Sequence, residues 1–268
     1  MKKMNKEMVL LTGASSGIGK EVASQLVKEK RYFPLLVARN IDKLQELKNE
    51  IKDCDIYSCD VTNPEQVKNL VDQVVSKYGG IDVLINNAGY GRFGGALDIP
   101  ISDYIGMMET NYLGAVRLTH AFLPYMLKAG SGKIINIASV AGLSGSPNLA
   151  AYCASKFALV GFSEALRLEY APRIQVGVLC PGPVQTPFFR GDDPSDLFPT
   201  PIARQILDVQ TVAHHAVQLI NRPRVKVIPR GLRWSMQFRK LVPGFYLQIT
   251  KKLYDSLKIR TKARRIDV

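Results

Sequence analysis

Long apolar stretches are missing from this sequence of 268 residues. A membrane-spanning helix needs roughly 18 consecutive apolar residues, and no stretch approaches that length. The first residues are basic and then apolar, but an apolar run of about five residues is too short for the h-region of a signal peptide. The sequence therefore predicts neither a membrane-spanning helix nor a secretory leader.

Cysteine and histidine are also scarce, with four and three residues respectively. Without a secretory leader, the cysteines are expected to be reduced thiols in a cytosolic protein. Cys54 and Cys59 lie close together, and His214 precedes His215, but neither pair has enough neighbouring ligands for a zinc site. We therefore expect no bound metal and a cytoplasmic location.

Acidic residues are nearly absent from the C-terminal part of the chain. Residues 222–268 contain 14 Lys and Arg but only 2 acidic residues, a net charge of +12 out of the total of +13. Residues 1–221 are therefore almost balanced, at +1 (22 basic, 21 acidic). The basic character belongs to the tail and not to the main body.

The chain does contain an alternation of short β-branched segments with longer helical patterns, which is typical of βαβ units on a parallel sheet. The predicted strands are 8–13, 33–38, 55–61, 81–86, 133–139, 174–180 and 225–229. Helices are predicted at 20–30, at 41–52, from Pro64 onward, and over two long segments, 103–128 and 152–170. We expect an α/β single-domain Rossmann fold, with a doubly wound parallel sheet of about seven strands and helices on both faces.

A glycine-rich turn, TGASSGIG, follows the first predicted strand and places glycines at 13, 17 and 19. Glycine lets the backbone turn sharply and approach a phosphate, while the next helix presents its N–H groups. The spacing differs from the G-x-G-x-x-G of the common dinucleotide motif. The position of the turn between a strand and a helix nevertheless indicates a dinucleotide site.

Arg39 stands at the end of the second predicted strand, twenty residues after Gly19. A carboxylate in this region selects the ribose 2′-hydroxyl of NAD, whereas an arginine accommodates a 2′-phosphate. Because a guanidinium can bind a phosphate through two hydrogen bonds, Arg39 favours NADP(H).

Tyr152 and Lys156 are four residues apart in the segment AYCASKFA, so both side chains lie on one helix face. Lowering a phenol pKa from about 10 to about 7 takes roughly 4 kcal/mol. A cation about 4 Å away, at an effective dielectric near 20, supplies about that amount. The pair therefore predicts a tyrosine that exchanges protons near neutral pH.

Seven elements occur in the order found in the short-chain dehydrogenases/reductases, and the chain resembles that family over about residues 8–190. They are TGASSGIG, Asp60-Val61, NNAG (Asn86–Gly89), Asn111, Ser139, the Tyr152/Lys156 pair and Pro181-Gly182. The resemblance implies hydride transfer between NADP(H) and a carbonyl or alcohol.

The resemblance also implies roles for individual residues. Tyr152 is the expected general acid/base, Lys156 lowers its pKa and binds the nicotinamide ribose, Ser139 holds the substrate oxygen, and Asn111 holds a proton-relaying water. The expected cofactor-binding residues are Gly13, Ser15, Ser16, Gly17, Ile18, Gly19, Arg39, Asn40, Asp60, Val61, Asn87, Ala88, Gly89, Tyr152, Lys156, Pro181, Gly182, Val184 and Thr186. Of these, Asp60 and Val61 contact the adenine, and residues 181–186 lie near the nicotinamide.

No internal repeat or linker marks a second domain. We expect residues 1–221 to form the NADP-binding catalytic domain, with a substrate lid around 187–205, and residues 222–268 to add the last strand and a basic amphipathic extension. The lid carries Phe188, Phe189, Leu197 and Phe198, which favours an apolar ketone, aldehyde or secondary alcohol.

The extension has apolar residues at helical spacing, beginning with Trp234, Phe238 and Leu241, flanked by basic residues. This pattern is typical of a helix that binds anionic membrane surfaces peripherally. It also fits a helix that packs on the pocket or on a subunit, which is the commoner use of an amphipathic helix. No nucleic-acid-binding module is recognisable.

Two other functional classes remain open at this point. A non-catalytic NADP(H)-binding regulator would not need an activated phenol, so the Asn111, Ser139, Tyr152 and Lys156 set speaks against it. Epimerases of the same family are usually longer than this chain. By the same resemblance, we expect a homodimer or homotetramer assembled through the two long helices.

Overall fold

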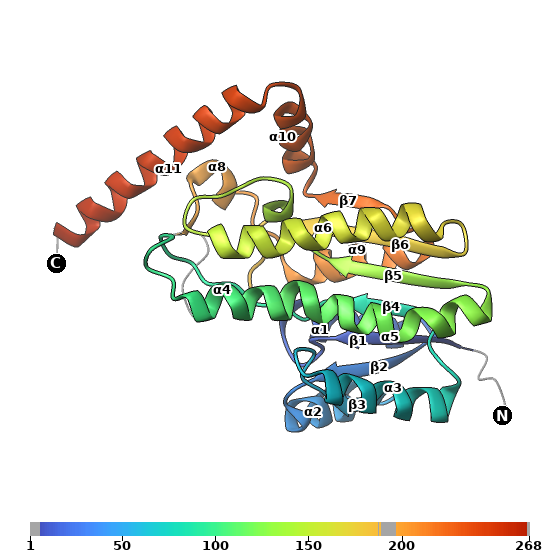
Figure 1. The fold of residues 1–268 in the computed structure, drawn as a ribbon. Coiled ribbons are helices and arrows are strands. Elements are labelled where there is room, and N and C mark those ends of the chain that lie inside the picture. The colour runs from blue at the N-terminus through green and yellow to red at the C-terminus, as the bar shows by residue number, and fades with distance from the viewer. Residues whose placement is uncertain (1–5, 187, 189–196, 267–268) are drawn as a thin grey trace.

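The computed structural model describes residues 6–186, 188 and 197–266, the segment 256–266 as backbone only. Its centre is one sheet of seven parallel strands in the order β3-β2-β1-β4-β5-β6-β7 (Figure 1). The strands are β1 (Glu7–Thr12), β2 (Tyr32–Ala38), β3 (Asp55–Ser58), β4 (Val83–Asn86), β5 (Gly132–Ile137), β6 (Ile174–Pro181) and β7 (Val225–Ile228). The predicted doubly wound Rossmann fold is confirmed.

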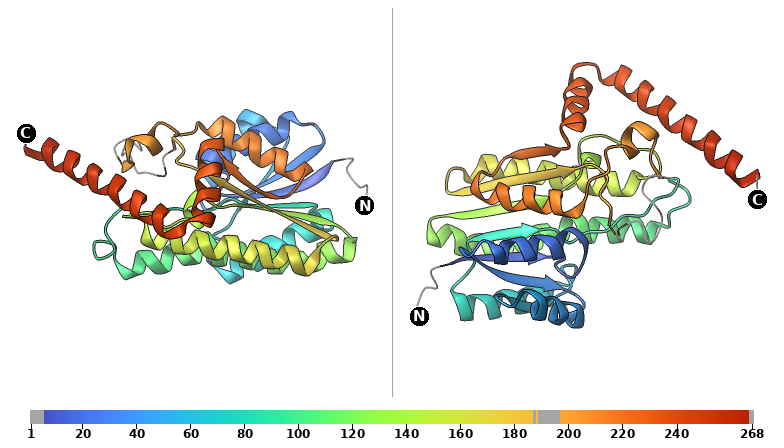
Figure 2. Two further views of the ribbon diagram at one scale, coloured as in Figure 1. Left: turned by 90° about the horizontal axis from the view of Figure 1, so that it is seen from above. Right: turned by 180° about the vertical axis from the view of Figure 1, so that it is seen from behind.

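Helices cover both faces of the sheet, as Figure 2 shows. The α-helices of the described residues are α1 (Gly17–Lys28), α2 (Ile41–Ile51), α3 (Pro64–Tyr78), α4 (Ile101–Met108), α5 (Gly114–Ala129), α6 (Ala150–Tyr170), α8 (Thr200–Ala203), α9 (Val209–Asn221), α10 (Arg230–Leu241) and α11 (Pro243–Ile266). No helix within the described ranges is long and apolar enough to cross a membrane.

Each face of the sheet has its own hydrophobic core. Successive side chains of a strand point to opposite faces, so Val9 and Leu11 of β1 pack with α1, α2 and α9, whereas Met8 and Leu10 pack with α3, α5 and α6. The strand order reverses between β1 and β4. Ligands of open α/β sheets bind at such a switch point, outside the carboxyl ends of the strands.

The long helix expected over 103–128 is interrupted. A π-helical segment, Glu109–Leu113, separates α4 from α5. Single π-helical turns inside α-helices are rare and are frequently found at functional sites, and apolar periodicity alone does not distinguish them from α-helix. Asn111, one of the expected site residues, lies in the middle of this segment.

The expected lid is described only in part, since 187 and 189–196, including Phe189, lie outside the described residues. In the described remainder, Thr200–Ala203 forms the short helix α8. The C-terminal extension forms two helices, α10 and α11, joined at Pro243 (Figure 1). All four cysteines are buried free thiols.

Candidate active site

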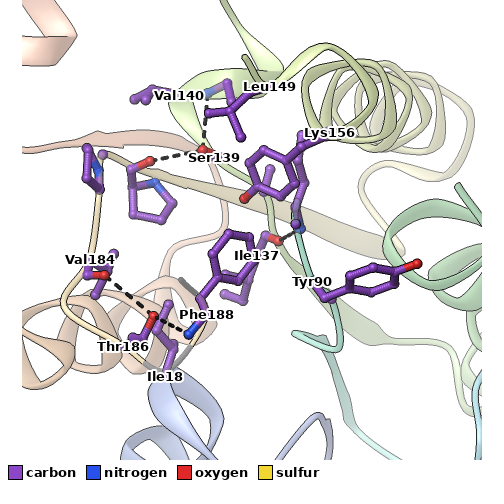
Figure 3. Close-up of a pocket in the computed structure, with 18 of the residues that line it drawn as sticks. Ile18, Tyr90, Ile137, Ser139, Val140, Leu149, Lys156, Val184, Thr186 and Phe188 are labelled. Carbon is purple, nitrogen blue, oxygen red and sulfur yellow. Dashed lines mark hydrogen bonds between the residues drawn. The ribbon is translucent and has the colours of Figure 1, made fainter. Parts of the chain in front are cut away.

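A cavity of about 720 Å³ lies at the carboxyl ends of the strands, a size typical of small-molecule and cofactor sites. Its floor comes from the loops after β1 to β6, and its outer walls come from α6, α8, α10 and α11. Figure 3 shows ten of its residues by name, among them Ser139, Lys156 and Phe188. All the residues expected to bind the cofactor line it except Gly19, which supports the glycine turn from behind. Of the four expected catalytic residues, Ser139, Tyr152 and Lys156 line it and Asn111 does not.

The glycine turn can form only with glycine at two positions. A Cβ on Gly19 would lie 2.1 Å from the carbonyl oxygen of Gly13, so the helix could not start this close to the strand. Gly13 adopts φ +65°, and a Cβ there would lie 2.9 Å from the Cα of Ala88. The turn therefore leaves open backbone beside the cavity, where a pyrophosphate fits at the N-terminus of α1.

Asn87 and Thr12 hold the loop after β4 against this turn. The Asn87 amide donates to the carbonyl of Thr12 at 2.9 Å, and the Thr12 hydroxyl accepts from the N–H groups of Asn87 and Ala88, both at 3.0 Å. These bonds fix the two edges of the switch point relative to each other. Asn87 thus holds the loop in place through its side-chain amide and its backbone N–H, in addition to lining the cavity.

Arg39 lines the cavity just beyond the end of β2, with Lys43 from the first turn of α2 beside it. Both side chains are exposed, and neither forms an ion pair within the described part of the chain. The Asn40 side chain accepts from the N–H of Lys43 at 2.9 Å and caps α2. Two cations beside the glycine turn suit an additional phosphate group; Lys43 was not predicted, although its spacing from Arg39 could have indicated it.

Asp60 and Val61 form the far side of this part of the cavity. One carboxylate oxygen of Asp60 accepts from the N–H of Thr62 at 2.9 Å and from its hydroxyl at 2.8 Å. The loop after β3 is thereby held in one conformation. A Cβ on Gly114 would lie 2.6 Å from a methyl group of Val61, so the start of α5 also supports this loop.

Ser139, Tyr152 and Lys156 meet at the ends of β5 and β6. Lys156 Nζ is buried, donates to the carbonyl of Ile137 at 2.9 Å, and lies 5.8 Å from the ring centroid of Tyr152. Ser139 Oγ accepts from the N–H of Ala141 at 3.1 Å and donates to the carbonyl of Pro181 at 3.4 Å (Figure 3). The long second bond leaves this hydroxyl available to another acceptor.

Burial is the largest cause of the pKa shifts of Tyr152 and Lys156. It raises the pKa of Tyr152 above its ordinary value, against a hydrogen bond from Ser139 that lowers it. Burial also lowers the pKa of Lys156 to about 8. The phenol is therefore protonated at neutral pH, so it can act as an acid toward a bound oxygen. Ser139, rather than Lys156, opposes the upward shift in this arrangement.

Asn111 supports the site from behind. Its amide nitrogen donates to the carbonyl of Tyr90 and to Ser155 Oγ, both at 2.9 Å, and its oxygen accepts from the N–H of Tyr90 at 2.9 Å. A Cβ on Gly89 would lie 2.9 Å from that oxygen and 3.5 Å from Lys156 Nζ. The π-helical turn thus connects the loop after β4 with the helix that carries Tyr152.

The segment after β6 closes the cavity from the side of α1. Thr186 lies next to Gly17, and the Gly182 N–H donates to the carbonyl of Ile228 at 2.8 Å. The Phe188 ring packs edge-on against Tyr152, with centroids 5.3 Å apart. Val184 is buried and pairs with Leu207.

The outer part of the cavity is apolar; the sequence pointed to Phe198 as one of its residues but not to Leu149, Met236 or Tyr254. It is formed in part by Leu149, Phe198, Met236, Ile249 and Tyr254. Tyr254 of α11 is buried, and its hydroxyl lies 2.7 Å from Ser146 Oγ. Part of the C-terminal extension therefore packs on the pocket, one of the two arrangements that the sequence left open.

Comparisons with known proteins agree with this geometry. The family model of the short chain dehydrogenases matches residues 7–196. A 3-ketodihydrosphingosine reductase of Bacteroides thetaiotaomicron is 42% identical over 200 residues, covering 72% of this chain and 70% of that protein. An uncharacterized oxidoreductase of Bacillus subtilis, YusZ, is 33% identical and covers 94% of this chain and 100% of its own length.

Solved structures show the same fold. A variant of actinorhodin polyketide ketoreductase with NADPH gives a TM-score of 0.78 at 33% identity, covering 87% of this chain and 99% of that one. An alcohol dehydrogenase of the archaeon Thermococcus sibiricus, complexed with 5-hydroxy-NADP, gives 0.73 at 26% identity, covering 83% and 95%. The chain belongs to the short-chain dehydrogenase/reductase family of NAD(P)-dependent oxidoreductases.

Proposed function

We propose that this chain transfers hydride between NADP(H) and an apolar ketone, aldehyde or secondary alcohol. The observation that carries the proposal is the convergence of Ser139, Tyr152 and Lys156 at one end of a cavity whose other end holds the glycine turn and Arg39. A dinucleotide reaching from one end to the other would place its nicotinamide beside the phenol.

The choice of NADP(H) rests on charge. Arg39 and Lys43 stand where a 2′-phosphate of the adenosine ribose would lie, and an arginine there accommodates that phosphate. Two of the similar solved structures hold NADPH or an NADP derivative, which supports the same choice.

When bound, NADPH supplies the hydride that reduces the carbonyl carbon. Tyr152, protonated because it is buried, donates its phenolic proton to the carbonyl oxygen as negative charge develops there. Ser139 donates a hydrogen bond to the same oxygen and orients it. Lys156 is mostly cationic at neutral pH, with a pKa of about 8, and its ammonium holds the nicotinamide ribose.

The nature of the substrate follows from the outer wall. Leu149, Phe198 and Met236 offer no charge to a bound molecule, and burial of apolar surface is the main favourable contribution there. One relative is named for reducing 3-ketodihydrosphingosine, and one similar structure is a polyketide ketoreductase. A long-chain or otherwise apolar ketone fits these observations.

Substitution Tyr152→Phe tests the proposal. The variant is expected to bind NADPH as the wild type does, because the ring and its packing against Phe188 remain, but to lose turnover by about 10²- to 10⁴-fold without the proton donor. NADPH oxidation with a panel of ketones measures turnover, and NADPH fluorescence measures binding. Undiminished turnover would remove Tyr152 from the mechanism.

We propose further that the protein works in the cytoplasm as a homodimer or homotetramer assembled through α4, α5 and α6. Ile101, Ile105 and Phe157 on these helices are exposed apolar side chains, which supports a subunit contact at this face.

A further inference from the structure

Exposed apolar side chains are concentrated at one corner of the molecule. Of fifteen large hydrophobic side chains that are exposed within the described residues, seven lie between Trp234 and Ile249. Six of the seven do not line the cavity, and we call them the corner patch: Trp234, Phe238, Leu241, Val242, Phe245 and Leu247. Scattered exposed hydrophobics are ordinary, but a contiguous patch marks an interaction surface.

The two C-terminal helices carry apolar residues on two different faces. On α10, Leu232 and Met236 are buried and line the cavity, while Trp234 and Leu241 are 75% and 80% exposed. On α11, Leu253 and Tyr254 line the cavity, while Phe245 and Leu247 are exposed on the two flanks of that side. Packing against the pocket therefore accounts for one face of each helix and leaves the corner patch uncovered.

The patch residues of the two helices meet at one point. Phe238 of α10 and Phe245 of α11 are in edge-to-face contact across the turn at Pro243, with ring centroids 6.2 Å apart. Figures 1 and 2 show this corner projecting beyond the sheet and its covering helices. A broad flat partner could thus reach the patch without touching the rest of the body.

Basic residues are concentrated along the segment that carries the patch. From Arg222 to Tyr254 the sequence has nine basic residues and no acidic one. Arg230, Arg233, Lys240, Lys251 and Lys252 are exposed on α10 and α11. A face that combines Trp, Phe and Leu with a margin of Lys and Arg matches the interface of an anionic lipid bilayer, where aromatic rings enter the headgroup region and cations meet lipid phosphates.

We propose that the corner patch docks the protein on an anionic membrane surface and that the cavity receives its substrate from that surface. The same two helices form the outer wall of the cavity and carry the patch, so an amphiphilic ketone held in the bilayer could pass along α10 and α11 into the apolar part of the site. The docking does not depend on the proposed function, whereas the source of the substrate rests on it.

Trp234 is the sole tryptophan of the chain, so its fluorescence reports on the patch directly. With vesicles of phosphatidylcholine and phosphatidylglycerol we expect a blue shift and co-sedimentation, both weakened by added salt, and neither with phosphatidylcholine alone. Leu241→Ser and Phe245→Ser should each weaken partitioning about tenfold, because each removes one apolar side chain that the bilayer would bury. Leu168→Ser is the matched control, since Leu168 is 79% exposed on α6, and should partition like the wild type.

Two results would overturn the docking proposal. One is equal partitioning of the patch variants and the control. The other is a change of oligomeric state in the patch variants, measured by light scattering, together with no vesicle binding by the wild type; the patch would then be a contact between subunits.

Access to the site is tested separately. Leu241→Ser should keep the wild-type kcat/KM for a short soluble ketone and lose several-fold with a long-chain ketone embedded in anionic vesicles. If both activities fall equally, or neither falls, the membrane does not supply the substrate. If the wild type reduces neither ketone, the proposed function fails while the vesicle-binding result still stands.

Discussion

Arg39 and Lys43 are two cations that the fold places on one side of the cavity, one at the end of a strand and one in the first turn of a helix. Their backbones are fixed by β2 and by the Asn40 cap of α2. The side chains extend from rigid elements, so an anion between them could be bound without reordering the chain.

Arg39→Ser should therefore weaken NADPH binding by about 10- to 100-fold, as expected for loss of a charge-assisted hydrogen bond, and leave NADH binding nearly unchanged. Fluorescence titration with both cofactors measures the difference. Arg31→Ser is the control, because Arg31 pairs with Glu29 on the surface. Equal losses for NADPH and NADH would show that Arg39 does not contact the 2′-phosphate.

Lys156 is a buried cation whose folded-state pKa is about 8, below the ordinary value of 10.5. Below pH 8 the ammonium is charged in both the folded and unfolded states, and its burial then costs the most stability. Between pH 8 and 10.5 the unfolded chain binds a proton that the folded chain does not, so this residue's contribution to stability rises with pH.

We predict that Lys156→Met is stabilised relative to the wild type most strongly below pH 8 and that this difference shrinks as pH rises toward 10. The change should not exceed about 1.4 kcal/mol per pH unit. Urea unfolding of both proteins across this range measures it, and the comparison cancels the titration of other groups. A difference that is independent of pH would place the pKa of Lys156 outside this window.

At the scale of elements, the π-helical turn Glu109–Leu113 is hydrogen-bonded to two other segments that line the cavity, the loop after β4 and α6. Asn111 bonds the loop after β4 through Tyr90 and bonds α6 through Ser155. Through these bonds α6, and with it Tyr152 and Lys156, is fixed relative to the floor of the cofactor site.

Asn111→Ala should lower the free energy of unfolding by about 2–4 kcal/mol, because it removes three buried hydrogen bonds. Ser155→Ala removes only the bond to α6 among these and should cost about 1 kcal/mol. Urea denaturation provides both values. If both variants lost the same amount, the bonds to Tyr90 would contribute nothing to stability.

Helices and strands could be predicted where neighbouring residues in the sequence determine them. The seven strands and the helices beside them follow from apolar runs and periodicity, and the glycine turn from residues that tolerate its backbone. The π-helical turn was not predictable, because apolar periodicity does not distinguish it from α-helix. Tyr254 was missed as a cavity residue because only tertiary packing brings it to the cavity, whereas Lys43 was missed although it lies only four residues after Arg39. The roles of Tyr152, Lys156 and the cofactor-binding residues stay predictions.

At the scale of the whole molecule, α4 and α6 lie along the sheet, whereas α10 and α11, which carry the corner patch, project beyond it (Figure 1). Phe157, 40% exposed on α6, is an aromatic that a subunit contact would cover. A protein with two such surfaces could assemble through one and dock on a membrane through the other.

Phe157→Asp is accordingly expected to convert the proposed homodimer or homotetramer into monomers, since burying an unpaired carboxylate in a subunit contact is unfavourable. Light scattering after size exclusion measures the mass. Ile41→Asp, at an exposed position on α2, is the control and should assemble normally. An unchanged mass for Phe157→Asp would place the subunit contact elsewhere.

The cavity takes its walls from nearly the entire chain, from Gly13 to Tyr254. During synthesis the glycine turn, the strands and α6 leave the ribosome well before α11. Until α11 has emerged, the pocket lacks the part of its wall that Leu253 and Tyr254 supply. The order of translation makes binding of an apolar substrate one of the last capacities that the growing polypeptide acquires.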